Sequence, residues 1–460
     1  MTYTWLTYAQ ARADIAQRLN DVSSVYWLNA GAQNEIGLLV KEALRTWQTL
    51  TGYWRARAVL NATANTTFYD LTAALNPAIR AYTVTDTEEI ASMQYRLSEN
   101  LGSPATGETW SGTAMFSLAQ LTSALQEQRD NFLVQTGAVL KVYPNVPCTP
   151  AQARYPLPDD TVMDVRRLAW IDGTTALKTV LWRQDEWQMT AYNPGWSLSQ
   201  GINPQSYSLA ATPPLTFSLA PSPVATGAVE LIATNTGAAL NPVTGVPLGV
   251  PDDWANVVKW GALADLLSDD GPAPDPLRSQ YCTERWESGL RLARVAPCIV
   301  ALAINGYNVF PTTLWDMDMY NSGWENLTAG PNQLSSAGLN LVALSPGNNP
   351  TPPGITLDVI RNAPTPVVDA DYLQVGREEW DAISGYCQHI ACFKLGGDEF
   401  VRTLPLYKNF LDEAAVYTDR LAAYAPMAKP LSLQMHTECE KVHRRLTDSK
   451  IEVTTNASGE

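Results

Sequence analysis

The chain has 460 residues, of which 45% are hydrophobic and 17% charged, and its formal net charge at pH 7 is −15. This composition excludes a disordered chain, and the length predicts two or three packed units, because single cores stop growing near about 250–300 residues. The acidic charge disfavours tight binding to nucleic-acid phosphates, which depends on Lys and Arg. We also expect neither a membrane span nor a signal peptide, because no stretch of about 18 apolar residues occurs.

Helical and β-like patterns alternate along the chain. Apolar residues at three- and four-residue spacing predict helices over 5–19, 30–53, 86–101 and 115–137. Short apolar runs bounded by Pro, Gly and Asn predict strands over 66–71, 81–84, 162–170, 175–182, 206–209, 215–219 and 228–233. Helical periodicity resumes at residue 253.

Two helical segments repeat each other. Residues 253–293 and 379–419 align without a gap at an offset of 126 (380 − 254). The shared positions are Trp254 and Trp380, Trp260 and Tyr386, Gly271 and Gly397, and Tyr281 and Tyr407. Upstream pieces match with small shifts: 193–196 with 321–324, 219–221 with 344–346, and 227–232 with 354–359. We interpret the repeated aromatic residues as core and the glycines as turns.

The repeat predicts the fold class and the organisation of the chain. The fold is expected to be α+β, with a helical-bundle core and antiparallel β units, and with a β-plus-helical-hairpin unit duplicated in tandem. The expected units are an N-terminal helical region with a short strand pair (1–139), a first copy (140–297), a second copy (298–425) and a C-terminal arm (426–460).

The sequence contains no recognisable catalytic arrangement. Nucleotide-binding, nucleophile-elbow and zinc-protease motifs are missing, and there are only three histidines. Cys387 and His389 are two residues apart and would point in different directions on a helix, whereas His389 and Cys392 could meet but lack further ligands. We therefore expect no enzyme, no catalytic residue, no cofactor and no metal site, and a structural role for His389.

The abundance of Trp and Tyr, 15 and 19 residues against 8 Phe, suggests binding surfaces. Aromatic rings stack on sugars, which would suit a carbohydrate-binding receptor protein. Tyr and Trp also dominate protein–protein interfaces, which would suit a subunit of an assembly. We favour the second interpretation.

The chain resembles the head-to-tail adaptor (connector) proteins of tailed bacteriophages. The resemblance is carried by residues 155–165, 250–267, 275–292 and 386–417. It implies a virion structural protein at the head–tail junction: a homo-oligomeric ring of about twelve copies that binds the portal and tail proteins, lines the DNA channel and touches passing DNA transiently. A tail or baseplate component is the alternative within the virion, and a Trp-rich carbohydrate-binding receptor protein is the alternative outside this role.

The last segment is expected to be a partner-binding arm. Prolines at 426 and 430 interrupt the helical pattern, and a basic cluster leads to a polar end. Its expected anchors are Leu431, Leu433, Met435, Val442, Arg444, Arg445 and Leu446. The functional hypothesis is that the arm becomes ordered against a neighbouring subunit or the portal, and the competing hypothesis is a free tail.

Overall fold

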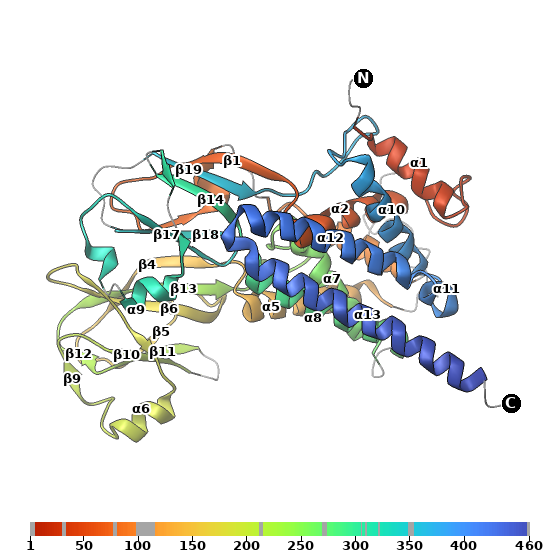
Figure 1. The fold of residues 1–460 in the computed structure, drawn as a ribbon. Coiled ribbons are helices and arrows are strands. Elements are labelled where there is room, and N and C mark those ends of the chain that lie inside the picture. Colours follow the sequence, from red (N-terminus) through yellow and green to blue (C-terminus); the bar gives the residue numbers. More distant parts are fainter. Residues whose placement is uncertain are drawn as a thin grey trace.

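The computed structural model describes residues 5–29, 34–76, 81–97, 116–210, 215–268, 274–304, 306–308, 311–320, 323–347 and 354–457. The long helices gather at one end of the molecule, and small, mainly antiparallel sheets lie at the other, together with the short helices α6 and α9 (Figure 1). The predicted α+β class with a helical core is confirmed.

The described helices are α1 Tyr8–Arg18, α2 Glu35–Thr51, α3 Leu71–Ala74, α4 Asp86–Arg96, α5 Leu118–Thr136, α6 Glu186–Tyr192, α7 Ala255–Leu266, α8 Pro276–Val295, α9 Leu314–Tyr320, α10 Arg377–Cys392, α11 Gly397–Val401, α12 Leu404–Tyr424 and α13 Lys429–Ala457. Within the described residues, short 3₁₀ helices are η2 Asp252–Trp254, η3 Trp324–Asn326 and η4 Pro426–Ala428.

The described strands are β1 Arg55–Leu60, β2 Phe68–Asp70, β3 Leu75–Asn76, β4 Lys141–Cys148, β5 Arg154–Pro156, β6 Val162–Asp172, β7 Lys178–Val180, β8 Trp182–Arg183, β9 Gln200–Gly201, β10 Ser206–Leu209, β11 Thr216–Ala220, β12 Ser222–Pro223, β13 Gly227–Asn235, β14 Ile299–Ile304, β15 Tyr307–Asn308, β16 Pro311–Thr312, β17 Gln333–Ala337, β18 Leu341–Ser345 and β19 Ile355–Ile360. Six of the seven predicted strands coincide with observed ones at least in part. The predicted strand over 66–71 is represented by β2, whereas the one over 81–84 leads only to a single bridge between Thr85 and Pro247.

Apart from the two-stranded sheet of β9 and β12, the described sheets occur in two pairs of equal topology. The order β7–β6–β13–β4 in one sheet corresponds to β15–β14–β19–β1 in another, and β8–β10–β11–β5 corresponds to β16–β17–β18–β2. The strand directions agree as well: β10 is parallel to β8 as β17 is to β16, and the other corresponding neighbours are antiparallel.

The helices that precede and follow these sheets in the chain also correspond. In one set α4, α5, α7 and α8 pack together, and in the other α1, α2, α10 and α12 do so. Threonine is the N-cap of both α1 and α4, and a left-handed glycine ends both α2 and α5. One backbone hydrogen bond also recurs: Leu248 N–H donates to Val84 O at 2.9 Å in one set, and Leu373 N–H donates to Leu6 O at 3.0 Å in the other.

We infer that the chain contains two copies of one unit and that they are nested rather than in tandem. The inner unit is residues 85–295, from α4 to α8. The outer unit is residues 7–70 together with 299–424, because β1 pairs with β19 and β2 pairs with β18. With this inferred nesting, a boundary at residue 139 would separate α4 and α5 from the sheets that they precede, and β1 and β2 from the sheets that they complete.

One core joins the helices of both units. Long helices of both units bury apolar faces there, as α2 does with Ile36, Val40 and Trp47, all fully buried. The paired sheets enclose separate cores, one in each unit. The helix α2 ends where Gly52 adopts φ +57°, and an added Cβ would lie 2.9 Å from the Ile360 side chain, so both backbone and space require glycine.

Candidate functional site

The repeated aromatic residues meet in the helical core. The ring centroids of Trp260 and Tyr281 are 5.7 Å apart in the inner unit, and those of Tyr386 and Tyr407 are 5.9 Å apart in the outer unit. The two pairs also touch each other, with Tyr281 and Tyr407 at 5.9 Å. The structure thus places these four residues in one cluster between the units.

The Arg285 guanidinium lies inside this cluster, between the two units. Its central carbon is 5.4 Å from the Trp260 ring, 6.0 Å from Tyr281, 5.2 Å from Tyr386 and 4.7 Å from Tyr407. It also donates a hydrogen bond of 2.5 Å to the Tyr386 hydroxyl. Cation–π contacts of this kind stabilise a partly desolvated guanidinium, so Arg285 joins the two units through their repeated rings.

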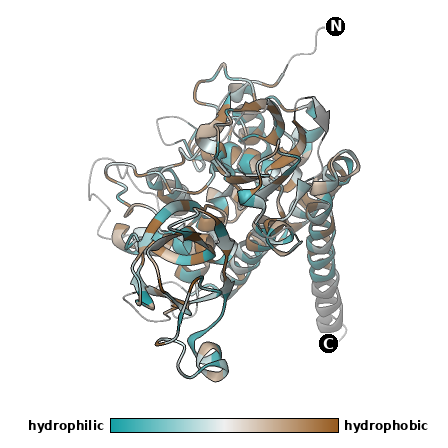
Figure 2. Ribbon diagram, turned by 90° about the vertical axis from the view of Figure 1, so that its left-hand side faces the viewer, coloured by the Kyte–Doolittle hydropathy of each residue, from teal (hydrophilic) through white to brown (hydrophobic). Residues whose placement is uncertain are grey.

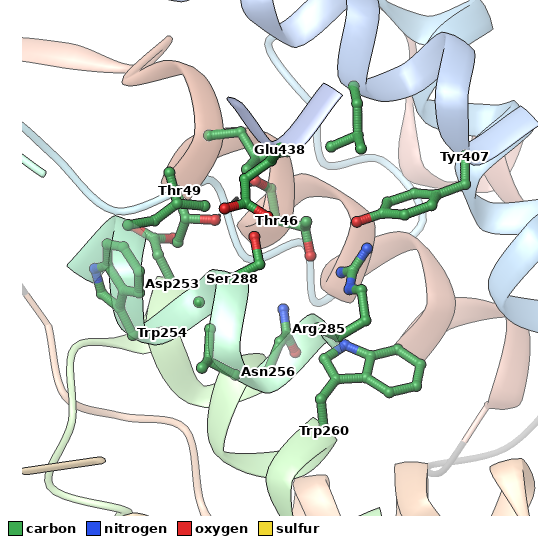
Figure 3. Close-up of a pocket in the computed structure, with 15 residues that line it drawn as sticks. Thr46, Thr49, Asp253, Trp254, Asn256, Trp260, Arg285, Ser288, Tyr407 and Glu438 are labelled. Atoms are coloured by element: carbon green, nitrogen blue, oxygen red, sulfur yellow. Dashed lines mark hydrogen bonds between the residues drawn. The ribbon is translucent and has the colours of Figure 1, made fainter. Parts of the chain in front are cut away.

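Next to Arg285 is a cavity of about 30 Å³. Thr46, Asn256, Ser288 and Glu438 contribute polar atoms to its lining (Figure 3). This volume holds about one water molecule, and the polar lining suits one. The cavity is too small for an organic substrate.

The remaining repeat positions are structural where they are described. Trp254, the N-cap of α7, is 3% exposed, and Trp380 in the first turn of α10 is 8% exposed. Trp380 donates its indole N–H to Asp14 Oδ2 at 2.9 Å. Gly397, the first residue of α11, has φ +49°, a left-handed conformation that favours glycine. Gly271 lies outside the described residues.

His389 is fully buried between two hydroxyl groups. Its Nε2 lies 2.8 Å from the Tyr281 hydroxyl and its Nδ1 lies 2.8 Å from Thr403 Oγ1. Burial, together with the charges of Arg285 and Arg96, holds the pKa of His389 well below its usual value. Within the described residues no group of His, Cys, Asp and Glu has the spacing of a metal site. The neutral imidazole therefore acts as a hydrogen-bonded core residue that connects α8, α10 and the start of α12.

A buried ion-pair network joins the β parts of the two units. Arg167 on β6 binds Asp318 on α9 in a bidentate pair, with distances of 2.8 and 3.0 Å, and also binds Glu325 on η3. Lys178 on β7 lies 2.6 Å from Glu230 on β13 and 2.9 Å from Glu325. Because Glu230 and Glu325 are both at most 6% exposed, the network is part of the interface between the units and not a solvated surface.

The two glutamates of this network have opposite pKa shifts. Burial, reinforced by the nearby charge of Glu325, raises the pKa of Glu230. Burial also opposes the charge on Glu325, but Arg167 and Lys178 outweigh it and hold the pKa of Glu325 below its usual value. This network is not among the sites predicted from the sequence. Its signal was the presence of Arg167 and Glu230 inside otherwise apolar strands.

A second buried network joins the helical parts. Glu42 on α2 lies 2.6 Å from Arg96 on α4 and 2.7 Å from Lys259 on α7, and Lys259 also pairs with Glu89 at 3.0 Å. Burial opposes the charge on Glu42, but Arg96 and Lys259 lower its pKa to about 2. The outer unit is therefore joined to the inner unit by charge at both ends of the molecule.

The expected C-terminal arm divides into a packed part and a projecting part. Leu431 and Met435 lie in the main core, and Val442 packs against it. Arg445 pairs with Glu284, and Arg444 lies on the exposed side. The remaining expected anchors are Leu433, which is 72% exposed, and the partly buried Leu446. The segment after residue 426 thus begins in the packed core, and α13 runs from there away from the body toward the C-terminus (Figure 1).

Corresponding aromatic side chains are exposed on the β parts of both units. Trp187 and Tyr192 on α6 are 79% and 85% exposed, and Trp315 and Tyr320 at the equivalent places on α9 are 58% and 80% exposed. Large apolar side chains exposed in this way are typical of contact surfaces.

Comparison with known proteins gives one family match. Residues 91–297 match the model of the SU10 adaptor protein family. No curated protein matches the chain. The matched segment nearly coincides with the inner unit, and it confirms the resemblance to phage adaptor proteins. No described helix is sufficiently long and apolar to cross a membrane.

Proposed function

We propose, on the premise that the inner unit is similar to a phage structural adaptor, that the chain forms a ring which joins the portal to the tail and lines the DNA channel. The observation that carries this proposal is the coincidence of the family match, residues 91–297, with a complete structural unit running from α4 to α8. Because the match covers nearly the whole inner unit, it supports similarity of the entire unit to the family and not of a single motif.

The outer unit extends this role. It repeats the helices and sheets of the inner unit around a common helical core, so each chain supplies two adaptor-like units to the particle. The net charge of −15 suits a channel through which DNA slides, because a negative wall repels phosphates. A structural role without catalysis is supported by three features: His389 is buried, the cavity holds only about one water molecule, and the buried carboxylates are ion-paired with Arg and Lys side chains.

Measurement of the mass of the purified full-length chain tests the proposal. A ring of about twelve copies that binds purified portal protein is the expected result. Electron microscopy of the complex should place the ring on the tail side of the portal. A chain that neither forms a ring nor binds the portal would contradict the proposal.

A carbohydrate-binding receptor protein is the second candidate, favoured by the exposed Trp187 and Trp315. Trimers that bind host polysaccharide would favour it, and rings without affinity for polysaccharide would exclude it. A tail or baseplate component would bind tail proteins but not the portal.

A further inference from the structure

The outer unit exposes arginine and tyrosine side chains together where β1 meets the end of α12. The guanidinium of Arg55 on β1 lies 5.7 Å from the ring centre of Tyr424, the last residue of α12, and both side chains are exposed. Arg420, one helical turn before Tyr424, is also exposed and lies 5.0 Å over the Tyr417 ring. That ring is in turn 5.7 Å from the ring of Tyr53, which lies just before β1. These contacts bring basic and aromatic side chains from two distant parts of the chain onto one surface.

Two hollows of about 480 and 650 Å³ flank Arg55 on this surface. Arg361 and the exposed Tyr372 line the smaller hollow, and Arg57 and Tyr424 line the larger one. Each hollow has room for side chains of a binding partner beside an arginine and an aromatic ring. We call the basic residues of this surface the arginine patch: Arg55, Arg57, Arg361 and Arg420.

The arginine patch carries more positive charge than nearby carboxylates neutralise. Arg57 pairs with Asp358 at 2.8 Å, although the Arg57 side chain is 72% exposed. Among the residues that the structure describes, Arg55, Arg361 and Arg420 have no acidic side chain within ion-pair distance. On a chain whose net charge is −15, this local excess of positive charge is complementary to an acidic partner.

The inner unit has apolar residues where the outer unit has this charged pair. Arg57 and Asp358 are cross-strand partners on β1 and β19, and Val142 and Ile232 are the corresponding partners on β4 and β13. The offsets are 85 (142 − 57) and 126 (358 − 232), and the first also relates the glycines that end α2 and α5 (137 − 52). Within the chain, Val142 and Ile232 pack against Leu341 of the outer unit. The apolar pair is thus covered by the chain itself, whereas the charged pair leaves its sheet face open to a polar partner.

The arginine patch belongs wholly to the outer unit. Its residues lie outside 91–297, the range that matches the adaptor family. Strands β1 and β19 are at the upper end of the molecule in Figure 1, and Figure 2, which views the molecule from the sheet end, keeps that end at the top. The exposed rings of α6 in the inner unit are at the opposite, lower end. A partner on the patch therefore contacts the part of the chain that the family match does not cover.

An acidic polypeptide segment fits this surface better than a nucleic acid does. Single strands also bind arginines and stack on aromatic rings, but they follow an extended basic groove. The patch has four arginines on a chain of net charge −15, so phosphates that extend beyond it would be repelled. A polypeptide segment needs carboxylates only where the arginines are.

We propose that an acidic segment of a second protein docks on the arginine patch. Its carboxylates bind Arg55, Arg361 and Arg420, and its apolar side chains enter the two hollows beside Arg55. Guanidinium groups hold carboxylates through directed, charge-assisted hydrogen bonds, and the exposed tyrosine rings add apolar contact area. The inference goes beyond the proposed function, because the contact depends neither on a ring nor on the inner unit.

Binding of a copolymer of glutamate and tyrosine to the full-length chain tests the contact. The wild type should bind the fluorescently labelled copolymer at low ionic strength, and the affinity should fall as salt is added. Arg55→Glu with Arg420→Glu reverses two exposed charges of the patch and should weaken this binding at least about ten-fold, with an unchanged unfolding temperature. The matched control is Arg402→Glu with Arg444→Glu, which reverses two exposed charges outside the patch and should bind like the wild type.

The two double variants have the same net charge, so a difference between them locates the binding on the patch. Equal binding by both variants, or no binding of the copolymer by the wild type, would overturn the inference. Single-stranded DNA is the competing ligand. If it binds the wild type more tightly than the copolymer does, and loses affinity when Arg55 and Arg420 are replaced, the patch is a nucleic-acid site and the inference is wrong.

Discussion

Arg167 on β6 of the inner unit and Asp318 on α9 of the outer unit form a bidentate ion pair with distances of 2.8 and 3.0 Å, and both side chains are largely shielded from solvent. The two residues are 151 positions apart in sequence. A planar guanidinium facing a carboxylate in this way fixes direction as well as distance. The pair therefore sets how the outer unit sits on the inner one.

Replacement of Glu325 by glutamine should destabilise this junction. The fold lowers the pKa of Glu325, so the carboxylate stabilises the protein in its charged form. Loss of this negative charge leaves the buried cations of Arg167 and Lys178 with too few counter-charges. We expect the free energy of unfolding to fall by roughly 3 kcal/mol or more at pH 7, measured by urea unfolding.

The matched control is Glu230→Gln in the same network. The pKa of Glu230 is raised, so its stabilising contribution is greatest when it is protonated, at low pH, and is lost as the pH rises through that raised value. The substitution should cost much less than Glu325→Gln and should flatten the dependence of stability on pH near neutrality. Equal losses in the two variants would contradict this assignment.

Acid should weaken the helical junction through Glu42. Its pKa is lowered from an ordinary value of 4.5 to about 2, so its contribution is present above pH 4.5 and is lost as the pH falls toward 2. The shift corresponds to about 3 kcal/mol. Unfolding curves of the wild type and of Glu42→Gln should therefore converge between pH 4.5 and pH 2, while Glu440→Gln, an exposed control on α13, should follow the wild type.

His389→Ala should lower stability without changing any titration near neutral pH. The substitution leaves a cavity and removes the partner of two buried hydroxyl groups, on Tyr281 and Thr403, at a cost of roughly 2–4 kcal/mol. His436→Ala is the control, because His436 is 53% exposed and pairs with Asp419 at the surface, where such pairs contribute about 0–1 kcal/mol. A thermal midpoint of His389→Ala equal to that of His436→Ala would refute the structural role.

Two truncations separate the packed and projecting parts of the C-terminal helix. A stop after Ala425 removes Ala428, Leu431 and Met435 from buried positions and should yield little folded protein. A stop after Thr447 leaves all of these contacts and should yield a folded subunit. If the end of the chain binds a neighbouring subunit or the portal, as one of the two hypotheses for residues 426–460 holds, particles built with this shorter chain should fail to join head to tail. Normal infectivity would show the end to be dispensable.

The sequence by itself determined the local elements and the existence of a repeat. Periodicity identified the main helices, and the gapless match of 253–293 with 379–419 located equivalent residues such as Tyr281 and Tyr407. One predicted register is wrong by one residue. The alignment of 227–232 with 354–359 pairs Val229 with residue 356, but the structure shows that Val229 and Leu231 face the core in one strand and Leu357 and Val359 do so in the other. A shift by one residue exchanges the two faces of a strand, and short apolar runs do not fix it.

Only the tertiary structure decided which strands belong together. Nothing local in residues 55–70 indicates that they pair with strands nearly 300 residues away, because backbone hydrogen bonding is the same for any partner and burial of the matching faces makes the choice. The nesting of the two units follows from that choice. The same holds for Arg167, Lys178 and Glu325, whose charges become a junction only because docking removes them from water together.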